Sequence, residues 1–416
     1  MTVISKNKIA LLEGLNSSEL AVNISDKQLA ESVLENISVP TTRVEAWKYT
    51  RVAKLCKKNY IQNSAELSSV EDYSMDDNAH TFVFVNGKFN AELSSQEEIE
   101  GVEVVSFEEM NEIPATNTQI EGELFNAINT AFLSGGVHVQ IANNAIVEKP
   151  IQLIHVIKGE ASIANFRTNI SIGKSAQATV HIGYFSENGE DKFCNVNASF
   201  EVGENANLTV NKVQFEDEST FHISTEEIRQ DRNSVFTLNT STLNGALVRN
   251  NVHVEVNGEN CVSNLNGVYL LKNKQHVDNH TVVDHKVPHC ESHELYKGVM
   301  DDKSTAVFNG KVYVRPDAQK INAFQSNGNV LLTDDVTVNS KPELEIYADD
   351  VKCSHGSTTG QLDDEAIFYL QARGISKRSA HQLMVAAFIG DVLDKIESEN
   401  FRLFVNGILK ERFGWE

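Results

Sequence analysis

The chain has 416 residues, of which 41% are hydrophobic and 23% charged, so it can bury a large core and has the composition of an ordered protein. Its formal net charge of −22 excludes the broad basic surface that binding to nucleic acid or to an anionic membrane requires. We therefore expect neither partner.

The N-terminus and the cysteines point to the cytoplasm. The first 20 residues lack the apolar centre of a secretory signal. No run of the chain reaches the roughly 18 apolar residues of a membrane span. The cysteines are odd in number and have no Cys-x-x-Cys pair, which is typical of reduced thiols in a cytoplasmic protein. They are Cys56, Cys194, Cys261, Cys290 and Cys353.

The first part of the chain mixes helix and strand signals. Apolar residues recur at near-helical spacing over residues 18–37, and residues 121–133 read as a second helix. Residues 80–93 hold two strand-like runs joined by an Asn-Gly pair, which predicts a hairpin. We expect a mixed α/β, mostly helical N-terminal domain over residues 1–136.

Residues 137–360 change to short strands rich in Val, Ile, Thr, Asn and Gly. The segment that starts at Gly173 is echoed at Gly203, a spacing of 30 residues. A recurring spacing of this kind favours a parallel β-helix over a sandwich, although the residues alone leave both open. Asn would suit such a fold because it accepts left-handed corners and can form ladders between stacked coils.

The end of this region carries a distinctive run. Residues 344–351 alternate roughly between apolar and polar, which predicts a half-buried strand. The Gly- and Thr-rich residues 356–360 are expected to break it. Asp363 or Asp364 then begins a helix with acidic residues in its first turn.

Residues 361–416 are expected to form a C-terminal helical domain. One apolar helix should follow Ser376, and another should cover residues 401–413. Two or three short helices cannot bury their own apolar faces. They must therefore pack on the β region or on a partner.

Cys353 and His355 are the candidate site. If the chain is extended there, residues two apart leave the same face of a strand, about 7 Å apart at the backbone. A soft thiolate and an imidazole placed in this way could share one soft metal ion or one iron–sulfur unit. A buried structural thiol beside a hydrogen-bonded histidine is the alternative.

A second group of histidines lies between His276 and His293. Four residues span about 13 Å on a strand, which is too wide for neighbouring imidazoles of one strand to share an ion. Asp278 could join His276 or His280, but two ligands do not make a metal site. We expect these side chains to be structural.

Other chemistry finds little support. Lys174 sits in a Gly-Lys-Ser run, but Thr168 stands where a phosphate-binding loop needs glycine, so no nucleotide site is expected. The chain also lacks a Gly-x-Ser-x-Gly nucleophile motif.

Several motifs carry a resemblance to one family over essentially the whole chain. They are RVEAWKYT at residues 43–50, LYKG at 295–298, VFNGK at 307–311, AQK at 318–320 and the long run at 341–375. In these motifs the chain resembles the SufB/SufD family of the SUF iron–sulfur cluster assembly scaffold. It is similar to the D-type members, because His355 is followed by glycine rather than by the glutamate typical of the SufB type.

The resemblance implies a right-handed parallel β-helix and a non-catalytic scaffold role in a SufB–SufC–SufD complex. The β-helix would pair with SufB, the C-terminal helices would bind the SufC ATPase, and the isolated chain could form a homodimer. His355 would act as a metal ligand for transient iron or a nascent cluster shared with SufB, with Cys353 the weaker candidate. A β-helix carbohydrate-active enzyme and a purely structural protein remain alternatives.

Overall fold

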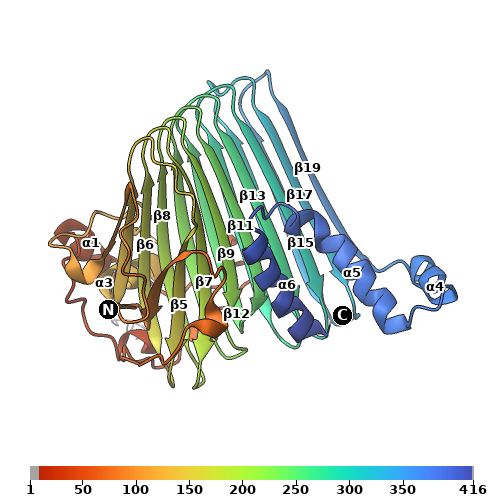
Figure 1. Ribbon diagram of the computed structural model, residues 1–416, viewed down its shortest axis with the longest axis horizontal. Coiled ribbons are helices and arrows are strands. Elements are labelled where there is room, and N and C mark those ends of the chain that lie inside the picture. The colour runs from red at the N-terminus through yellow and green to blue at the C-terminus, as the bar shows by residue number, and fades with distance from the viewer. Residues whose placement is uncertain (1–8, 415–416) are drawn as a thin grey trace, which may run out of the picture.

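The computed structural model describes residues 9–414 and is dominated by a β-solenoid (Figure 1). From β4 onward, successive strands go alternately to two sheets, and neighbours within a sheet run parallel. The ten-stranded sheet has the order β19-β17-β15-β13-β11-β9-β7-β5-β1-β2, and the nine-stranded sheet β18-β16-β14-β12-β10-β8-β6-β4-β3. The predicted parallel β-helix is confirmed.

The strand bounds show how regular the coils are, since most strands are ten residues long. The strands are β1 (His80–Val85), β2 (Lys88–Asn90), β3 (Val102–Ser106), β4 (Gly135–Ile141), β5 (Ile151–Lys158), β6 (Ile163–Ile172), β7 (Gln177–Glu187), β8 (Phe193–Val202), β9 (Asn207–Phe215), β10 (Phe221–Gln230), β11 (Val235–Asn244), β12 (Leu247–Val256), β13 (Val262–Leu271), β14 (His276–His285), β15 (Glu291–Met300), β16 (Thr305–Val314), β17 (Asn322–Leu331), β18 (Thr337–Ile346) and β19 (Lys352–Gln361).

Helices lie at both ends of the chain. They are α1 (Ile24–Asn36), α2 (Ala53–Cys56), α3 (Leu124–Ala131), α4 (Asp364–Ala372), α5 (Lys377–Leu393) and α6 (Glu399–Phe413), with short 3₁₀ turns at Ala10–Leu12, Glu45–Trp47, Glu71–Tyr73 and Phe107–Glu109.

Asparagines hold the corners of successive coils together. Asn205, Asn233 and Asn260 all adopt left-handed backbone conformations, with φ of 59°, 58° and 59°. Their side chains also form a ladder, because Asn233 donates to Asn205 at 2.9 Å and Asn260 donates to Asn233 at 3.0 Å. A small amide suits both demands, since it tolerates a positive φ and can donate and accept at once. Both roles expected of Asn are confirmed.

The start of the solenoid is closed by antiparallel strands. The predicted hairpin is confirmed as β1 and β2, joined at Asn86 and Gly87, which both have positive φ. The hairpin extends the ten-stranded sheet, and β3 ends the other sheet by pairing antiparallel with β4.

Both N-terminal helices are shorter than expected. α1 begins at Ile24 because Asn23 caps it by accepting from the amide of Ser25 at 3.1 Å. Ser18, where the helix was predicted to start, instead donates its hydroxyl to the carbonyl of Leu133. The helix predicted over residues 121–133 is α3.

The strand predicted over residues 344–351 is wrong in its bounds. β18 ends at Ile346, and the chain turns at residues 347–351. In this turn the backbone carbonyl of Asp350 accepts a hydrogen bond from the backbone amide of Lys320. The Gly- and Thr-rich segment that was expected to break the strand is part of β19 and pairs in register with β17. The parallel ladder outweighs the weak strand propensity of the two glycines in this segment.

Two C-terminal helices cover one face of the solenoid. Val385 and Ile389 of α5 and Phe401 of α6 are buried in one apolar cluster with Val268 and Val299 of the sheet. Figure 1 shows α5 and α6 across the strands and α4 projecting past the last coil, at the end opposite to α1 and α3. Asp363 caps α4 by accepting from the Glu365 amide at 2.9 Å, as the sequence predicts.

Glycine and tyrosine alternate across two neighbouring strands inside the core. Gly267 of β13 lies beside Tyr296 of β15, and Tyr269 lies beside Gly298. Both tyrosines are almost fully buried, and a Cβ on either glycine would overlap the facing ring. Each glycine therefore makes room for a tyrosine of the next coil.

We predict that Gly298→Ala lowers the free energy of unfolding by roughly 1–3 kcal/mol, because overpacking forces the Tyr269 ring to move. Urea unfolding followed by circular dichroism would measure the change. Gly360→Ala is the matched control, since a Cβ at this strand position meets no atom within 4 Å. Equal midpoints for the two variants would contradict the packing argument.

Candidate functional site

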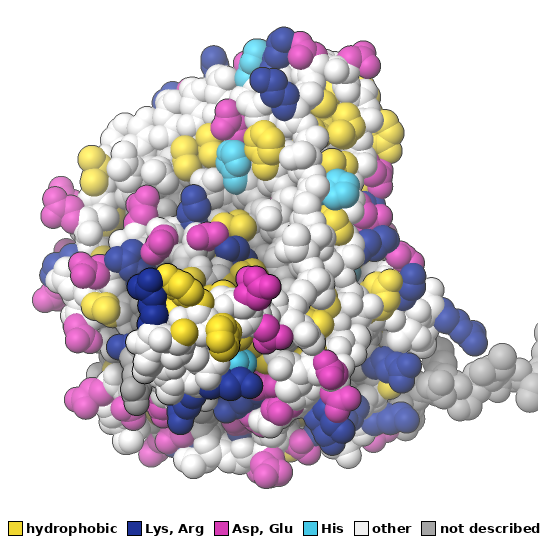
Figure 2. Space-filling view, turned by 90° about the vertical axis from the view of Figure 1, so that its right-hand side faces the viewer, with side chains coloured by type: hydrophobic (Ala, Val, Ile, Leu, Met, Phe, Trp, Pro, Cys, Tyr) yellow, Lys and Arg dark blue, Asp and Glu magenta, His cyan; other side chains and the backbone are white. Residues whose placement is uncertain are grey.

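His355 lies on the last coil of the solenoid. Its strand, β19, is bonded to β17 on one side and ends the ten-stranded sheet on the other. The side chain is exposed, as are most residues of the strand. Figure 2 looks at this end of the molecule and shows histidine and hydrophobic side chains in its upper half, together with some charged ones.

Cys353 and His355 share the inward-facing row of β19. Cys353 packs against the solenoid core, and Ser357, four residues on, bonds across to Ser340 of the other sheet at 2.7 Å. Since every second residue of a strand points the same way, His355 belongs to this row. The structure thus places both predicted residues on one face, at the open end of the core.

A polar column runs from the interior to His355. The strand register puts Glu294 of β15, Gln325 of β17 and His355 side by side in successive coils. Glu294 and Gln325 are buried, and Thr281 donates its hydroxyl to Glu294 at 2.6 Å. Burial raises the pKa of Glu294 to about 7. A carboxyl group with a pKa near neutral pH, that of Glu294, therefore lies two coils before the exposed imidazole of His355.

The sequence analysis missed Glu294 and Gln325. Their signal was the repeat spacing, because stepping back from His355 by one coil reaches Gln325 and by two coils reaches Glu294. The register of each coil is fixed by its corners, and the repeat in the sequence was too weak to give it.

A groove of about 700 Å³ opens beside His355. His293 and Phe324 stack in it with ring centres 5.7 Å apart, and Lys395 and Glu397, between α5 and α6, line it as well. The groove therefore joins the last coils to the C-terminal helices.

The donors at this end are too few to hold a metal ion alone. His355 offers one imidazole, and Cys353 offers one thiol, which packs against the core. A stable site needs about four ligands. Further donors would have to come from another molecule.

Three histidines between residues 276 and 293 contact neighbouring side chains. His276 bonds to the Thr50 hydroxyl at 2.8 Å, and His280 contacts Asp278 at 3.0 Å. Although burial opposes it, the Arg249 guanidinium holds the pKa of Asp278 well below its usual range. The hydroxyl of Ser292 bonds to His285 at 2.9 Å.

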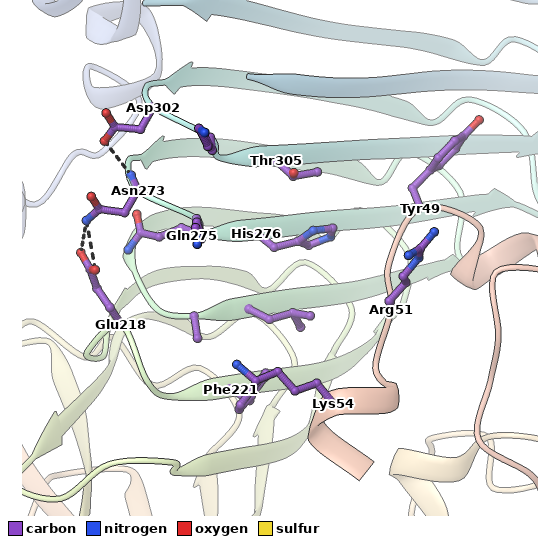
Figure 3. A pocket seen from close by; sticks show the side chains of 14 residues that line it. Tyr49, Arg51, Lys54, Glu218, Phe221, Asn273, Gln275, His276, Asp302 and Thr305 are labelled. Carbon is purple, nitrogen blue, oxygen red and sulfur yellow. Dashed lines mark hydrogen bonds between the residues drawn. The ribbon is translucent and has the colours of Figure 1, made fainter. Parts of the chain in front are cut away.

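A second pocket, of about 770 Å³, lies between the N-terminal segment and the coils (Figure 3). Tyr49, Arg51 and Lys54 lie opposite His276 of β14 and Asn273 in the turn before it. The side chains around this pocket carry both signs of charge, and the imidazole of His276 is already bonded to the Thr50 hydroxyl. Within the described residues we find no nucleophile and base paired in it.

The remaining cysteine and membrane predictions can also be checked. All five cysteines are free thiols. Among residues 9–414, no helix has the length and apolar character that a bilayer crossing demands.

Comparisons with known proteins cover nearly the whole chain. The family model described as "SUF system FeS cluster assembly, SufBD core domain" matches residues 155–388, and "SufBD protein N-terminal region" matches residues 13–153. The chain is 30% identical to the iron-sulfur cluster assembly protein SufD of Escherichia coli, over 88% of this chain and 87% of that protein. It is also 30% identical to an iron-sulfur cluster assembly SufBD family protein of Synechocystis, over 95% of this chain and 92% of that protein.

We predict that the stability of the chain falls as pH rises from about 4.5 to about 7, in part because of Glu294. The folded-state pKa is above the unfolded one, so the folded state binds more protons in this window and loses stability as they leave. The loss is on the order of 3 kcal/mol at neutral pH and above. Glu294→Gln should remove this component.

Urea unfolding at pH 5 and pH 8 would measure how much of the pH dependence of stability comes from Glu294. Glu291→Gln, on the same strand but exposed, is the control and should keep the pH dependence of the unchanged chain. An unchanged dependence in Glu294→Gln would show that the carboxyl is not perturbed.

Proposed function

This chain belongs to the SufB/SufD family of the SUF iron–sulfur cluster assembly system and is SufD-like, and we propose that it is a non-catalytic scaffold subunit of a SufB–SufC–SufD complex. In this role it would help to acquire iron and build a nascent cluster where it meets SufB. The matched family is described as acting in iron–sulfur cluster assembly. We therefore set aside the alternative of a carbohydrate-active enzyme, which the β-helix also suggested.

The open end of the solenoid is the observation that carries this proposal. β18 and β19 each have a sheet neighbour on one side only, so their outer edges are free within the described residues. An exposed strand edge is a template for pairing with another chain, and solenoid ends normally need a cap. A second β-helix of the same family, SufB, would supply matching strands.

The incomplete donor set supports a shared site. His355 and Cys353 lie on the edge strand itself, so a paired subunit would bring its own side chains next to them. Iron or a nascent cluster would be the cargo held between the two chains, with the neutral imidazole of His355 as one ligand. Cys353 is the weaker candidate because it packs against the core.

The C-terminal helices support a docking site for the SufC ATPase. On α4, the Phe368 side chain is 72% exposed and Tyr369 is 57% exposed, while Ile367 faces inward. Exposed aromatic residues on a projecting helix are typical of a protein interface. ATP hydrolysis on SufC could then act on the subunit boundary through a rigid solenoid.

We predict that His355→Ala leaves the three-subunit complex assembled but lowers its bound iron and sulfide at least about tenfold, because a metal ligand is lost. The measurement is co-expression with SufB and SufC, followed by iron and sulfide analysis of the purified complex. Ser354→Ala, on the opposite face of the same strand, is the control. Normal cluster content in His355→Ala would remove the metal role and leave a purely structural protein.

We predict that Phe368→Ala weakens the binding of SufC roughly tenfold or more, since burying a phenylalanine side chain contributes about 1.5–3 kcal/mol. Calorimetric titration of the chain with SufC would measure this. Ile146→Ala removes a similarly exposed side chain, 69% exposed, outside the C-terminal helices and serves as the control. Equal affinity of both variants would place the ATPase elsewhere.

A further inference from the structure

Three buried side chains inside the solenoid form a group that the proposed function does not use. They are Cys194 on β8, Glu216 just after β9 and His222 on β10, and one ligand atom of each lies within 4.8 Å of the others. We propose that this group holds one divalent transition-metal ion, Zn²⁺, as a structural centre of the coil stack.

The parallel register brings two of the ligands together. His222 is the direct neighbour of Cys194 on adjacent strands, and the same column continues with Ala164 on one side and Val248 on the other. Strand spacing sets neighbouring positions about 4.8 Å apart. A thiol and an imidazole thus interrupt an otherwise apolar inward-facing column.

Glu216 completes the group from the corner after β9. Its position there is not fixed by the spacing between neighbouring strands. The ligand atoms around a tetrahedral Zn²⁺ lie about 3.3–3.8 Å apart, given metal–ligand bonds of about 2.0–2.3 Å. The observed spread therefore needs a contraction of roughly 1 Å, which side-chain rotation can supply.

Polar atoms in the group lack partners. Glu216 and His222 are both 0% exposed, and the one hydrogen bond between them joins His222 Nδ1 and Glu216 Oε1 at 2.9 Å. Within the described residues, Glu216 Oε2 and His222 Nε2 have no hydrogen-bond partner. Leaving buried polar atoms unpaired costs about 1–3 kcal/mol each, and more when the group is charged. A metal ion bound to Glu216 would satisfy its unpaired carboxylate oxygen.

Charge balance also favours a cation. Lys192, two residues before Cys194, forms an ion pair with Asp217 at 2.6 Å, and Lys212 is paired with Glu226. These lysines are therefore engaged with other carboxylates. A divalent ion with one thiolate, one carboxylate and one neutral imidazole has no net charge, which suits a site removed from water.

A small cavity lies beside Cys194. It has a volume of about 20 Å³ and is lined by Cys194, Tyr184 and His155, among others. This is enough for one water molecule, which needs about 10–15 Å³. His155 is buried and its Nε2 is also unpartnered within residues 9–414, so it could bond to that water.

The types of ligand atom in the group indicate which metal ion it would bind. Cysteine, histidine and a carboxylate are common Zn²⁺ ligands, whereas Ca²⁺ and Mg²⁺ take oxygen donors. A site this deep would be filled while the chain folds, so metal binding would add to stability. β8 lies well inside the solenoid and β19 at its end, so this site is separate from the one proposed at His355 (Figure 1).

The test unfolds the full chain, removes metal with a chelator and refolds it with Zn²⁺, with Co²⁺ or with neither. We expect one metal per chain and a thiolate-to-Co²⁺ charge-transfer absorption in the Co²⁺ sample. Cys194→Ser should abolish that absorption, and Glu216→Gln should lower the bound metal at least about tenfold. His355→Ala should keep both, so failure here is distinguishable from failure of the cluster role.

Cys56→Ser is the matched control, because Cys56 is equally buried and lies outside the group. Should the variants fail to fold, the unchanged chain still decides the question, since refolding with Zn²⁺ should raise its midpoint of thermal unfolding over the metal-free chain. A chain that refolds without metal to the same midpoint and takes up none would overturn the proposal. So would a Co²⁺ spectrum that is unaltered in folded Cys194→Ser.

Discussion

In-register parallel stacking is the constraint on which the rest of this molecule depends. Once the coils align, each residue has a fixed neighbour in the coil before and the coil after, about 4.8 Å away. Asn205, Asn233 and Asn260 form a ladder for this reason, and Tyr269 fits beside Gly298 for the same reason. Side chains act here as members of columns, so an exposed residue such as His355 continues a row that begins in the core.

Much of the fold could be predicted from local patterns. The hairpin at Asn86 and Gly87, the corner asparagines and the cap at Asp363 are all short-range signals, and all three are confirmed. The end of β18 at Ile346 and the extent of β19 could not be predicted in the same way. The glycines of β19 have little strand preference of their own, and they are extended because β17 offers them a complete ladder.

In the candidate site, too, only the short-range relations could be predicted from the sequence. Two residues of one strand, Cys353 and His355, can be placed on one face from their spacing alone. Glu294 belongs to the same row only through two coil-to-coil registers, which local patterns do not reveal. The group of Cys194 and His222 joins residues of different coils, and Glu216 enters it from a corner whose geometry no periodicity describes.

The two ends of the coil stack differ in kind. At the first end the antiparallel strands β2 and β3 finish both sheets, whereas at the other end the parallel strands β18 and β19 are the last strands among the described residues. In the proposed pairing, only the end formed by β18 and β19 would join a second β-helix. Under that proposal, growth would stop at two chains, and the asymmetry would keep a long β structure from forming fibres.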